Sequence, residues 1–367
     1  MGDKTYRGAP IGHTGKGNWG HGLHLGLRNH PRVEIVAVAD EDEEERNNKQ
    51  RELSAPRAYA DWSHMIEEEQ PEIVSVGPRW TDCHLEMVLA CLEVGAHVYC
   101  EKPMTWNLAD GDQIVKKARE TGQKVAVAHQ GVYLPRIQSV KQELAAGRIG
   151  TVQAIYAHGK QDLRGGGEDM IVLGTHLFNM MRMFVGDVAW MSAHIAHEGR
   201  DIEVGDVREA GEPVGPIAGD YVNSYFHFKS GVAGFFDSRK FDEGGGKRMG
   251  MEIVGSEGII LLRGGGSGVA ALYPHVVFDP MDSAQAWEDL NTVADEPLST
   301  GNDLAVADLI TAAEADREPI SSAADAVAAL EMILGAYEAQ ITGGRVPFPM
   351  QRRGHPLIAW REDAHRG

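Results

Sequence analysis

The stretch Ala96-His97-Val98-Tyr99-Cys100-Glu101-Lys102-Pro103 joins a short apolar run to a charged pair and a proline. The apolar run predicts a buried strand, and Pro103, which lacks an N–H group and fixes its own φ, ends that strand. Open α/β sheets bind their ligands at the carboxyl ends of their strands, where Glu101 and Lys102 stand. Because a lysine is costly to bury unless its charge is used, this tripeptide indicates either an ion pair at a strand end or a functional site.

Further strand-like and helix-like segments surround this stretch. Apolar runs are found at residues 33–39, 73–76 and 124–127, and helix-like segments at residues 85–92 and 114–119. Strands that alternate with helices predict a parallel sheet with helices on both faces, and nearly continuous apolar runs are typical of strands buried on both faces. We therefore expect residues 1–130 to form one α/β domain.

The sequence pattern changes after Gly150. Alternating segments joined by glycine-containing turns predict β-hairpins at residues 221–236 and 252–262, hence an antiparallel sheet. Two amphipathic helices are expected at residues 303–314 and 323–342. These elements predict a second α/β domain over residues 131–350 and a C-terminal tail over residues 351–367.

A glycine-rich segment, Ile11-Gly12-His13-Thr14-Gly15-Lys16-Gly17-Asn18-Trp19-Gly20, follows the first candidate strand. Glycines let the backbone approach a pyrophosphate, whose charge then meets a helix N-terminus. Residues 15–20 match G-x-G-x-x-G literally but begin far from the strand, whereas residues 12–15 begin at its end with Thr14 in the middle glycine's place. We favour the second register. The candidate cofactor contacts in this loop are Gly12, Thr14, Gly15, Gly17, Asn18 and Trp19.

Asp40 ends the second strand, at about the distance from the glycine loop where an acid binds the ribose 2′-hydroxyl of a dinucleotide. The acidic run Glu41–Glu45 behind it is typical of the first turn of a helix. The same charges repel the 2′-phosphate of NADP. The sequence therefore predicts NAD as the cofactor.

Composition excludes several classes of protein. At 367 residues the chain is expected to hold two domains, and its formal charge of −19 argues against a nucleic-acid partner. No apolar run is long enough to span a membrane, and the first residues lack the apolar core of a signal peptide. The three cysteines form no CxxC pair and indicate reduced thiols in a cytoplasmic protein. Histidines near the glycine loop lack further ligands at metal-binding spacing, so we expect no metal.

With the glycine loop, Asp40 and Glu101-Lys102-Pro103 in this order, the sequence resembles the glucose–fructose oxidoreductase/inositol dehydrogenase (Gfo/Idh/MocA) family. Further matches to that family are Pro78 and His84 after the fourth strand, Lys141, Gly147-Arg148-Ile149-Gly150 and Val152 at the domain junction, and Gly166-Gly167, Gly174 and His176 in a GG…D-x-G-x-H segment. The resemblance implies an N-terminal Rossmann domain and a C-terminal α/β domain with a large, open, mostly antiparallel sheet, often used for homo-oligomerisation. It also implies NAD and sugar or cyclitol substrates.

The resemblance assigns roles to particular residues. Lys102 is expected to bind the reacting oxygen, because an ammonium stabilises a developing alkoxide. His176 is expected to transfer the proton, because imidazole titrates near neutral pH. Expected cofactor neighbours after the strand ends are Pro78, Arg79, His84, Glu101 and Lys102.

The sequence departs from the family at the catalytic histidine. Val172 stands where the family has an aspartate four residues before it, and Asn179 replaces a common acid three residues after it. Glu168 and Asp169 are the alternative carboxylates, and His176 is otherwise a structural histidine at a helix start. A polar cluster of Lys160, Asp162 and Arg164 is either part of a polyol site or a solvated loop.

Three functions are compatible with these residues. The first is an NAD-dependent oxidoreductase acting on a secondary hydroxyl or ketone of a sugar, cyclitol or glycoside. The second is a glycosidase that retains NAD and cleaves by oxidation and elimination, for which the same lysine and nicotinamide would serve. The third is a non-enzymatic sensor of NAD or sugar, which only the missing aspartate supports. We favour the first, as a homo-oligomer with a small-molecule substrate.

Overall fold

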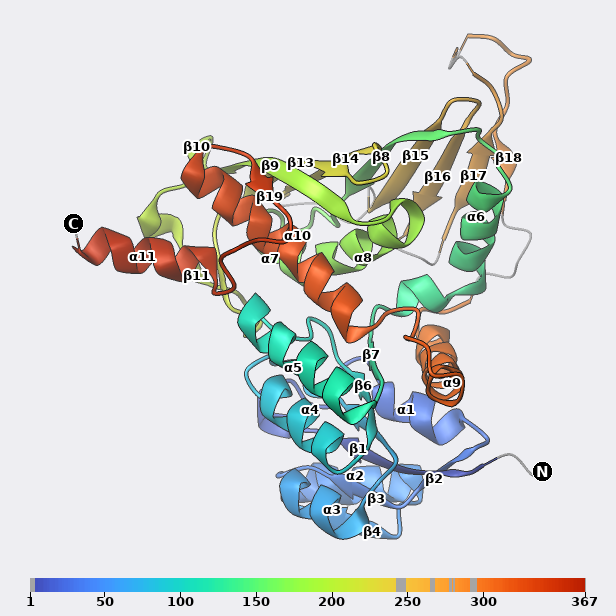
Figure 1. The fold of residues 1–367 in the computed structure, drawn as a ribbon, viewed down its shortest axis with the longest axis vertical. Coiled ribbons are helices and arrows are strands. Elements are labelled where there is room, and N and C mark those ends of the chain that lie inside the picture. Colours follow the sequence, from blue (N-terminus) through green and yellow to red (C-terminus); the bar gives the residue numbers. More distant parts are fainter. Residues whose placement is uncertain are drawn as a thin grey trace. The chain divides into compact units, whose positions relative to one another are not determined.

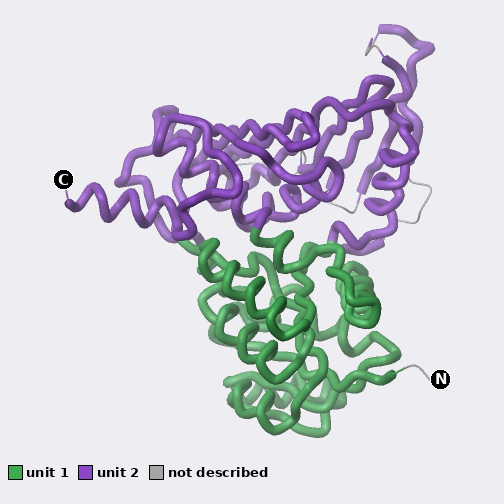
Figure 2. The backbone as a smooth tube through the Cα atoms, viewed as in Figure 1, with its two compact units in different colours: residues 1–130, 212–215, 299–327 green, residues 131–211, 216–298, 328–367 purple. Residues whose placement is uncertain are grey.

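The computed structural model describes residues 4–241, 249–264, 268–276, 279, 281–290 and 296–366. The chain divides into two compact units, coloured separately in Figure 2. Unit 1 contains Met1–Gln130, Glu212–Gly215 and Ser299–Val327, and unit 2 contains Gly131–Gly211, Pro216–Leu298 and Ala328–Gly367. Residues 299–327, which the sequence analysis assigned to the second domain, thus belong to the first unit.

Unit 1 is built on a seven-stranded sheet whose pairings are all parallel. Its strands are β1 (Tyr6–Ile11), β2 (Val33–Ile35), β3 (Ala37–Ala39), β4 (Arg57–Tyr59), β5 (Ile73–Val76), β6 (His97–Cys100) and β7 (Val125–Val127). They follow the order β4-β3-β1-β5-β6-β7, with β2 also paired to β1. The order reverses at β1 and β5, which places a ligand crevice at their carboxyl ends.

The single strand expected over residues 33–39 is divided into β2 and β3, both paired to β1. Val36 interrupts it and donates its N–H to Gly8 O at 2.9 Å. Pro10 lies between the stretches of β1 that β2 and β3 pair with, and it has no N–H to continue the ladder. The prediction of one continuous strand was therefore wrong.

Several helices of unit 1 begin or end at residues that the sequence identifies as helix caps. They are α1 (Leu23–Asn29), α2 (Glu43–Leu53), α3 (Trp62–Glu69), α4 (His84–Glu93), α5 (Leu108–Thr121) and α9 (Thr300–Glu314), with a short 3-10 turn, η1 (Thr14–Lys16), before α1. The Asp42 side chain caps α2 by accepting from Glu45 N at 2.8 Å. Gly122, at φ +74°, ends α5.

Helix α9 comes from late in the chain and packs beside α1 (Figure 1). A Cβ at Gly26 of α1 would lie 2.8 Å from Asn302 O, so only glycine permits this close approach. The Tyr99 hydroxyl of β6 donates to Asn302 Oδ1 at 2.7 Å, and both residues are buried. These contacts are the physical reason that residues 299–327 belong to unit 1.

Unit 2 contains a ten-stranded sheet in which only β8 and β14 pair in parallel. Its strands are β8 (Val152–His158), β9 (Val188–His197), β10 (Arg200–Asp201), β13 (Tyr221–Phe228), β14 (Ala233–Arg239), β15 (Gly250–Gly255), β16 (Ile259–Arg263), β17 (Ala270–Tyr273), β18 (Glu288–Asp289) and β19 (Val346–Pro347). Both predicted hairpins are present, as β13–β14 and β15–β16. The predicted fold class is confirmed.

The remaining elements of unit 2 are short connections and helices. They are η2 (Gln130–Tyr133), α6 (Pro135–Ala145), α7 (Gly167–Val172), α8 (Gly174–Val185), η3 (Val204–Asp206), the pair β11 (Arg208–Glu209) and β12 (Pro216–Ile217), α10 (Ala323–Thr342) and α11 (Pro356–Arg366). The first residues of η2 and α10, Gln130 and Ala323–Val327, belong to unit 1. The expected tail therefore contains a helix. No helix within the described ranges combines the length and apolar character needed to cross a bilayer.

Side chains of the large sheet alternate between two different environments. On β13, Val222, Ser224, Phe226 and Phe228 are buried, while the residues that alternate with them are only half-buried. Phe226 packs against Phe178 of α8 with ring centroids 5.6 Å apart. Helices α7, α8 and α10 lie on this inner face in Figure 1.

Phe226→Ala is expected to lower the free energy of unfolding by about 3–5 kcal/mol, because it leaves a cavity in the densely packed inner face. Val276→Ala is the control, since Val276 is 75% exposed and its truncation should change stability by no more than about 0.5 kcal/mol. Urea unfolding followed by circular dichroism measures both variants. Equal stability of the two would contradict this placement of the core.

Candidate active site

The glycine-rich loop begins where β1 ends, as the favoured register requires, but it continues as far as Gly22 before α1 begins. Gly12 N donates to Ala39 O at 2.9 Å. A Cβ at Gly17, which has φ +83°, would lie 2.6 Å from Arg79 Cβ. The loop is therefore held close to the ends of both β3 and β5, on the two sides of β1.

Glu101 fastens this loop to the end of β6. Its carboxylate is fully buried and accepts from His21 N at 2.9 Å and from Lys102 N at 2.8 Å. His21 Nδ1 lies 3.0 Å from Glu101 Oε1. Burial opposes ionisation, but the His21 contacts and the Lys102 charge outweigh it and hold the pKa of Glu101 below its ordinary value. The motif pointed to Glu101, whereas no pattern in the sequence indicated its partner His21.

The loop after β5 is braced by two residues that were expected near the cofactor. His84 is fully buried, with Nε2 2.7 Å from Pro78 O and Nδ1 3.0 Å from Met104 O. Arg79 pairs with Glu212 and donates its N–H to Lys16 O at 3.1 Å. In this structure Pro78, Arg79 and His84 thus support the backbone around the glycine loop.

Trp19 lies in the hydrophobic core and not at the surface of the crevice. It is 5% exposed and belongs to a cluster with Val38, Leu53 and Ala55. A Cβ at Gly12 would lie 2.2 Å from the Trp19 ring, so the glycine makes room for the indole. The indole of Trp19 thus packs inward, and its expected place beside the cofactor stays a prediction. Asn18, at φ 61°, remains exposed on the loop.

Asp40 stands at the end of β3, where the sequence placed it, but its carboxylate is only 1% exposed. It accepts from Thr14 N at 3.1 Å and from the Thr14 hydroxyl at 3.0 Å. Beside it lies a cavity of about 220 Å³ that His13, Glu41 and Asp61 also line. This is the crevice where a Rossmann domain holds the adenosine half of a dinucleotide.

Lys102 and His176 belong to different units. Lys102 follows β6 in unit 1 and is 4% exposed. His176 stands in the first turn of α8 in unit 2, is 7% exposed, and donates its backbone N–H to Leu173 O at 3.1 Å. Val172 and Asn179, the departures from the family pattern, are buried at the end of α7 and within α8.

The two carboxylates upstream of His176 have different environments. Glu168 accepts from Gly211 N at 3.1 Å and lies 3.5 Å from Arg208 Nη1, which ties the segment of residues 208–211 to α7. Asp169 is completely buried and accepts from Ser238 Oγ at 2.6 Å and Gln161 N at 3.0 Å. Burial raises the pKa of Asp169 despite these hydrogen bonds. Asp169 Oδ1 has no hydrogen-bond partner within the described ranges.

The polar cluster expected before the glycines is formed. Asp162 Oδ2 lies 3.0 Å from Lys160 Nζ and 3.2 Å from Arg164 Nη2. Partial burial opposes ionisation, but the hydrogen bonds from Arg164 and Lys160 lower the pKa of Asp162 to about 2. The three side chains remain partly exposed, so they are accessible to a polar ligand.

A parallel sheet with reversed strand order, a glycine-rich loop after its first strand and an acid at the end of β3 define a dinucleotide-binding Rossmann domain. Residues 11–129 match the Gfo/Idh/MocA oxidoreductase family, NAD-binding Rossmann fold, and residues 137–261 match the Gfo/Idh/MocA C-terminal domain. The chain belongs to this family. The resemblance inferred from the motifs is confirmed, and NAD is the cofactor of the family's Rossmann domain.

Several relatives are dehydrogenases of polyols and sugars. The chain is 25% identical over 234 residues to myo-inositol 2-dehydrogenase of Thermotoga maritima, an alignment that covers 62% of this chain and 66% of that protein. It is 29% identical over 200 residues to D-apiose dehydrogenase of Paraburkholderia graminis, covering 52% of each. The chain thus spans between about half and two thirds of the length of these curated relatives.

Solved structures share the fold over nearly the whole chain. An NAD-binding oxidoreductase from Klebsiella pneumoniae superposes with a TM-score of 0.76 at 19% identity, covering 94% of this chain and 99% of that chain. Levoglucosan dehydrogenase in complex with NADH and levoglucosan gives a TM-score of 0.76 at 16% identity, covering 95% and 100%. At these identities the matches establish the architecture.

Glu101→Gln is expected to lower the free energy of unfolding by about 1–3 kcal/mol, because an amide NH₂ would face buried N–H donors. The effect should depend on pH. Since the pKa of Glu101 is lowered in the fold, its contribution is fully present above pH 4.5, the ordinary value, and is lost as the pH falls through the folded pKa. Urea titrations at pH 7 and below pH 4 test this: the wild-type protein should lose more stability on acidification than the variant. An identical loss in both would contradict the assignment.

Proposed function

We propose that this protein is an NAD-dependent oxidoreductase that transfers hydride between NAD and a secondary hydroxyl or ketone of a sugar, cyclitol or glycoside. The observation that carries the proposal is the carboxyl edge of the Rossmann sheet. There Glu101 is used to hold the glycine loop, and the next residue, Lys102, is a buried cation. Relatives named as inositol and apiose dehydrogenases support the substrate class.

The division of labour follows from the chemistry of the two side chains. NAD, when bound, accepts or returns the hydride. Lys102 binds the reacting oxygen and stabilises the negative charge that develops on it. His176 takes the hydroxyl proton as the alcohol is oxidised and returns it in the reverse direction. Asp162 and its two basic partners offer charged groups that can hydrogen-bond the other hydroxyls of a polyol.

Val172 stands in place of the family aspartate, and two other carboxylates lie upstream of His176. Of the two nearby carboxylates, Glu168 already binds Gly211 N and Arg208, which makes it a support of the 208–211 segment. Asp169 is buried with one oxygen atom unpartnered within the described residues. Asp169 is therefore the carboxylate that we propose to test next to His176, in place of Glu168.

Lys102→Ala should lower kcat by about 100-fold or more while leaving NAD binding largely intact, because one preorganised donor to the transition state is lost. His176→Ala should lower kcat by about 100-fold and flatten the acid limb of the pH–rate profile. The assay is a screen of sugars, cyclitols and glycosides with NAD that follows both NADH absorbance and sugar products.

Three outcomes of that screen separate the possible functions. Stoichiometric accumulation of NADH supports the dehydrogenase. Cleavage of glycosides without net NADH would replace it with the glycosidase that retains NAD. Absence of turnover with every substrate, together with tight NAD binding, would indicate a sensor.

Near-normal turnover and an unchanged pH profile in His176→Ala would return that histidine to a structural role.

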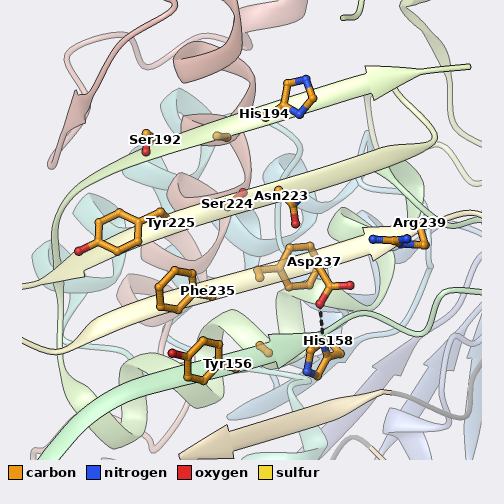
Figure 3. Close-up of a pocket in the computed structure, with 13 residues that line it drawn as sticks. Tyr156, His158, Ser192, His194, Asn223, Ser224, Tyr225, Phe235, Asp237 and Arg239 are labelled. Atoms are coloured by element: carbon orange, nitrogen blue, oxygen red, sulfur yellow. Dashed lines mark hydrogen bonds and ion pairs between the residues drawn. The ribbon is translucent and has the colours of Figure 1, made fainter. Parts of the chain in front are cut away.

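The proposal includes assembly into a homo-oligomer through the outer face of the large sheet, shown in Figure 3. This face presents an aromatic row in which Tyr156 and Phe235 stack with ring centroids 4.7 Å apart, and Phe235 meets Tyr225 at 5.3 Å. A cavity of about 590 Å³ on the same face is lined by these rings and by the paired side chains of His158 and Asp237. Such a mixed aromatic and polar surface is typical of a protein interface.

Phe235→Glu is expected to shift the protein to a monomer of 39.9 kDa in sedimentation at micromolar concentration, because it places a charge in the centre of the aromatic row. Val276→Glu, at a position that is 75% exposed, adds the same charge outside this face and should leave the assembly unchanged. A wild-type protein that sediments only as a monomer would refute the interface.

A further inference from the structure

The cavity beside Asp40 lies at the carboxyl edge of the sheet in unit 1. It has a volume of about 220 Å³ and is formed by the end of β3, the glycine loop and the start of α3. Three carboxylates, Asp40, Glu41 and Asp61, contribute to its walls. A cavity with this charge is suited to a neutral diol and unsuited to a phosphate.

Asp40 is already used by the protein. Its Oδ1 atom accepts from Thr14 N and from Asp42 N, both at 3.1 Å, and its Oδ2 atom accepts from the Thr14 hydroxyl at 3.0 Å. With only 1% of its surface exposed, this carboxylate has little room for a further donor. Thr14 stands where the favoured register has the middle glycine. Its hydroxyl donates a hydrogen bond to Asp40, the acid that would otherwise face the ribose.

Glu41 is presented to the cavity instead. Arg46 Nη1 donates to Asp40 O at 2.8 Å and to Glu41 O at 3.1 Å, which fixes the backbone of this pair. The side chain of Glu41 is 55% exposed. Its Oε1 atom lies over the glycine loop, 2.7 Å from where a Cβ on Gly15 would stand.

His13 adds a second observation at the same place. Its Nδ1 atom lies 2.9 Å from Glu41 Oε1 but makes no hydrogen bond to any described residue, although the atom is buried. His13 also lines the cavity. His13 thus holds the Glu41 carboxylate at the cavity wall, and the exposed remainder of this carboxylate can accept hydrogen bonds from the hydroxyls of a ribose diol.

We infer that two roles usually combined in one acid, support of the glycine loop and recognition of the ribose, are divided here between the neighbouring residues Asp40 and Glu41. Asp40 is a positioning residue that holds the glycine loop through Thr14, and Glu41, assisted by His13, accepts the hydrogen bonds of the adenosine ribose and sets the preference for NAD over NADP. This inference rests on the proposed function, since it assigns the residue that recognises the cofactor of that same site.

Four single variants and the wild type test the division by calorimetric titration with NAD and with NADP and by the melting temperature of the ligand-free protein. Glu41→Gln should weaken NAD about tenfold, the scale of hydrogen bonds to a charged group, and narrow the ratio of NADP to NAD dissociation constants without lowering the melting temperature. Glu67→Gln removes the same charge from an exposed position on α3, outside the acidic run Glu41–Glu45, and should change neither cofactor affinity nor melting temperature.

Asp40→Asn should instead lower the melting temperature and weaken NAD and NADP by the same factor, because it loosens the loop that both cofactors share. Thr14→Val, which removes the hydroxyl but keeps the side-chain volume, should reproduce that pattern, and it serves as the test if Asp40→Asn does not fold. The inference would be overturned if Asp40→Asn lost the preference for NAD over NADP while Glu41→Gln kept the wild-type preference. A wild-type protein that binds neither cofactor would overturn the proposed function as well.

Discussion

The buried carboxylate of Glu101 is the interaction on which the cofactor-binding half of this protein depends. The carboxylate accepts one hydrogen bond from His21 N in the glycine loop and one from the backbone N–H of Lys102. The loop and Lys102 are therefore held by the same carboxylate group. Leaving a buried charge unpaired costs several kcal/mol, whereas both oxygen atoms of Glu101 accept hydrogen bonds. The backbone of Lys102 is therefore positioned by the same carboxylate that holds the glycine loop.

Much of the architecture could be predicted because period and length of apolar segments reflect burial directly. The apolar runs at residues 73–76 and 96–100, the glycine turns of the hairpins and the closing helices gave the correct elements, whereas the run at residues 33–39 forms two strands. The sequence could not show that α9 belongs to the first unit. An apolar stripe indicates that a helix is buried but not which element it packs against. The packing of α9 in unit 1 depends on the close approach at Gly26 and on the hydrogen bond from Tyr99.

The positions of several candidate site residues could be predicted for a related reason. Motif spacing located Asp40, Glu101 and Lys102 at strand ends, because strand ends follow from the pattern of apolar residues. It could not show that Thr14 would occupy Asp40, nor that Trp19 would turn inward against Gly12. Both outcomes depend on the path of an irregular loop, where contacts between residues far apart in sequence decide which way a side chain faces.

The late return of the chain into unit 1 has a consequence for the order of folding. Domains usually form as they leave the ribosome, N-terminal part first. Here Asn302 supplies the buried partner of Tyr99, so the nascent N-terminal segment cannot complete its interior until most of the polypeptide has been made. During that interval the surface that α9 will cover is exposed.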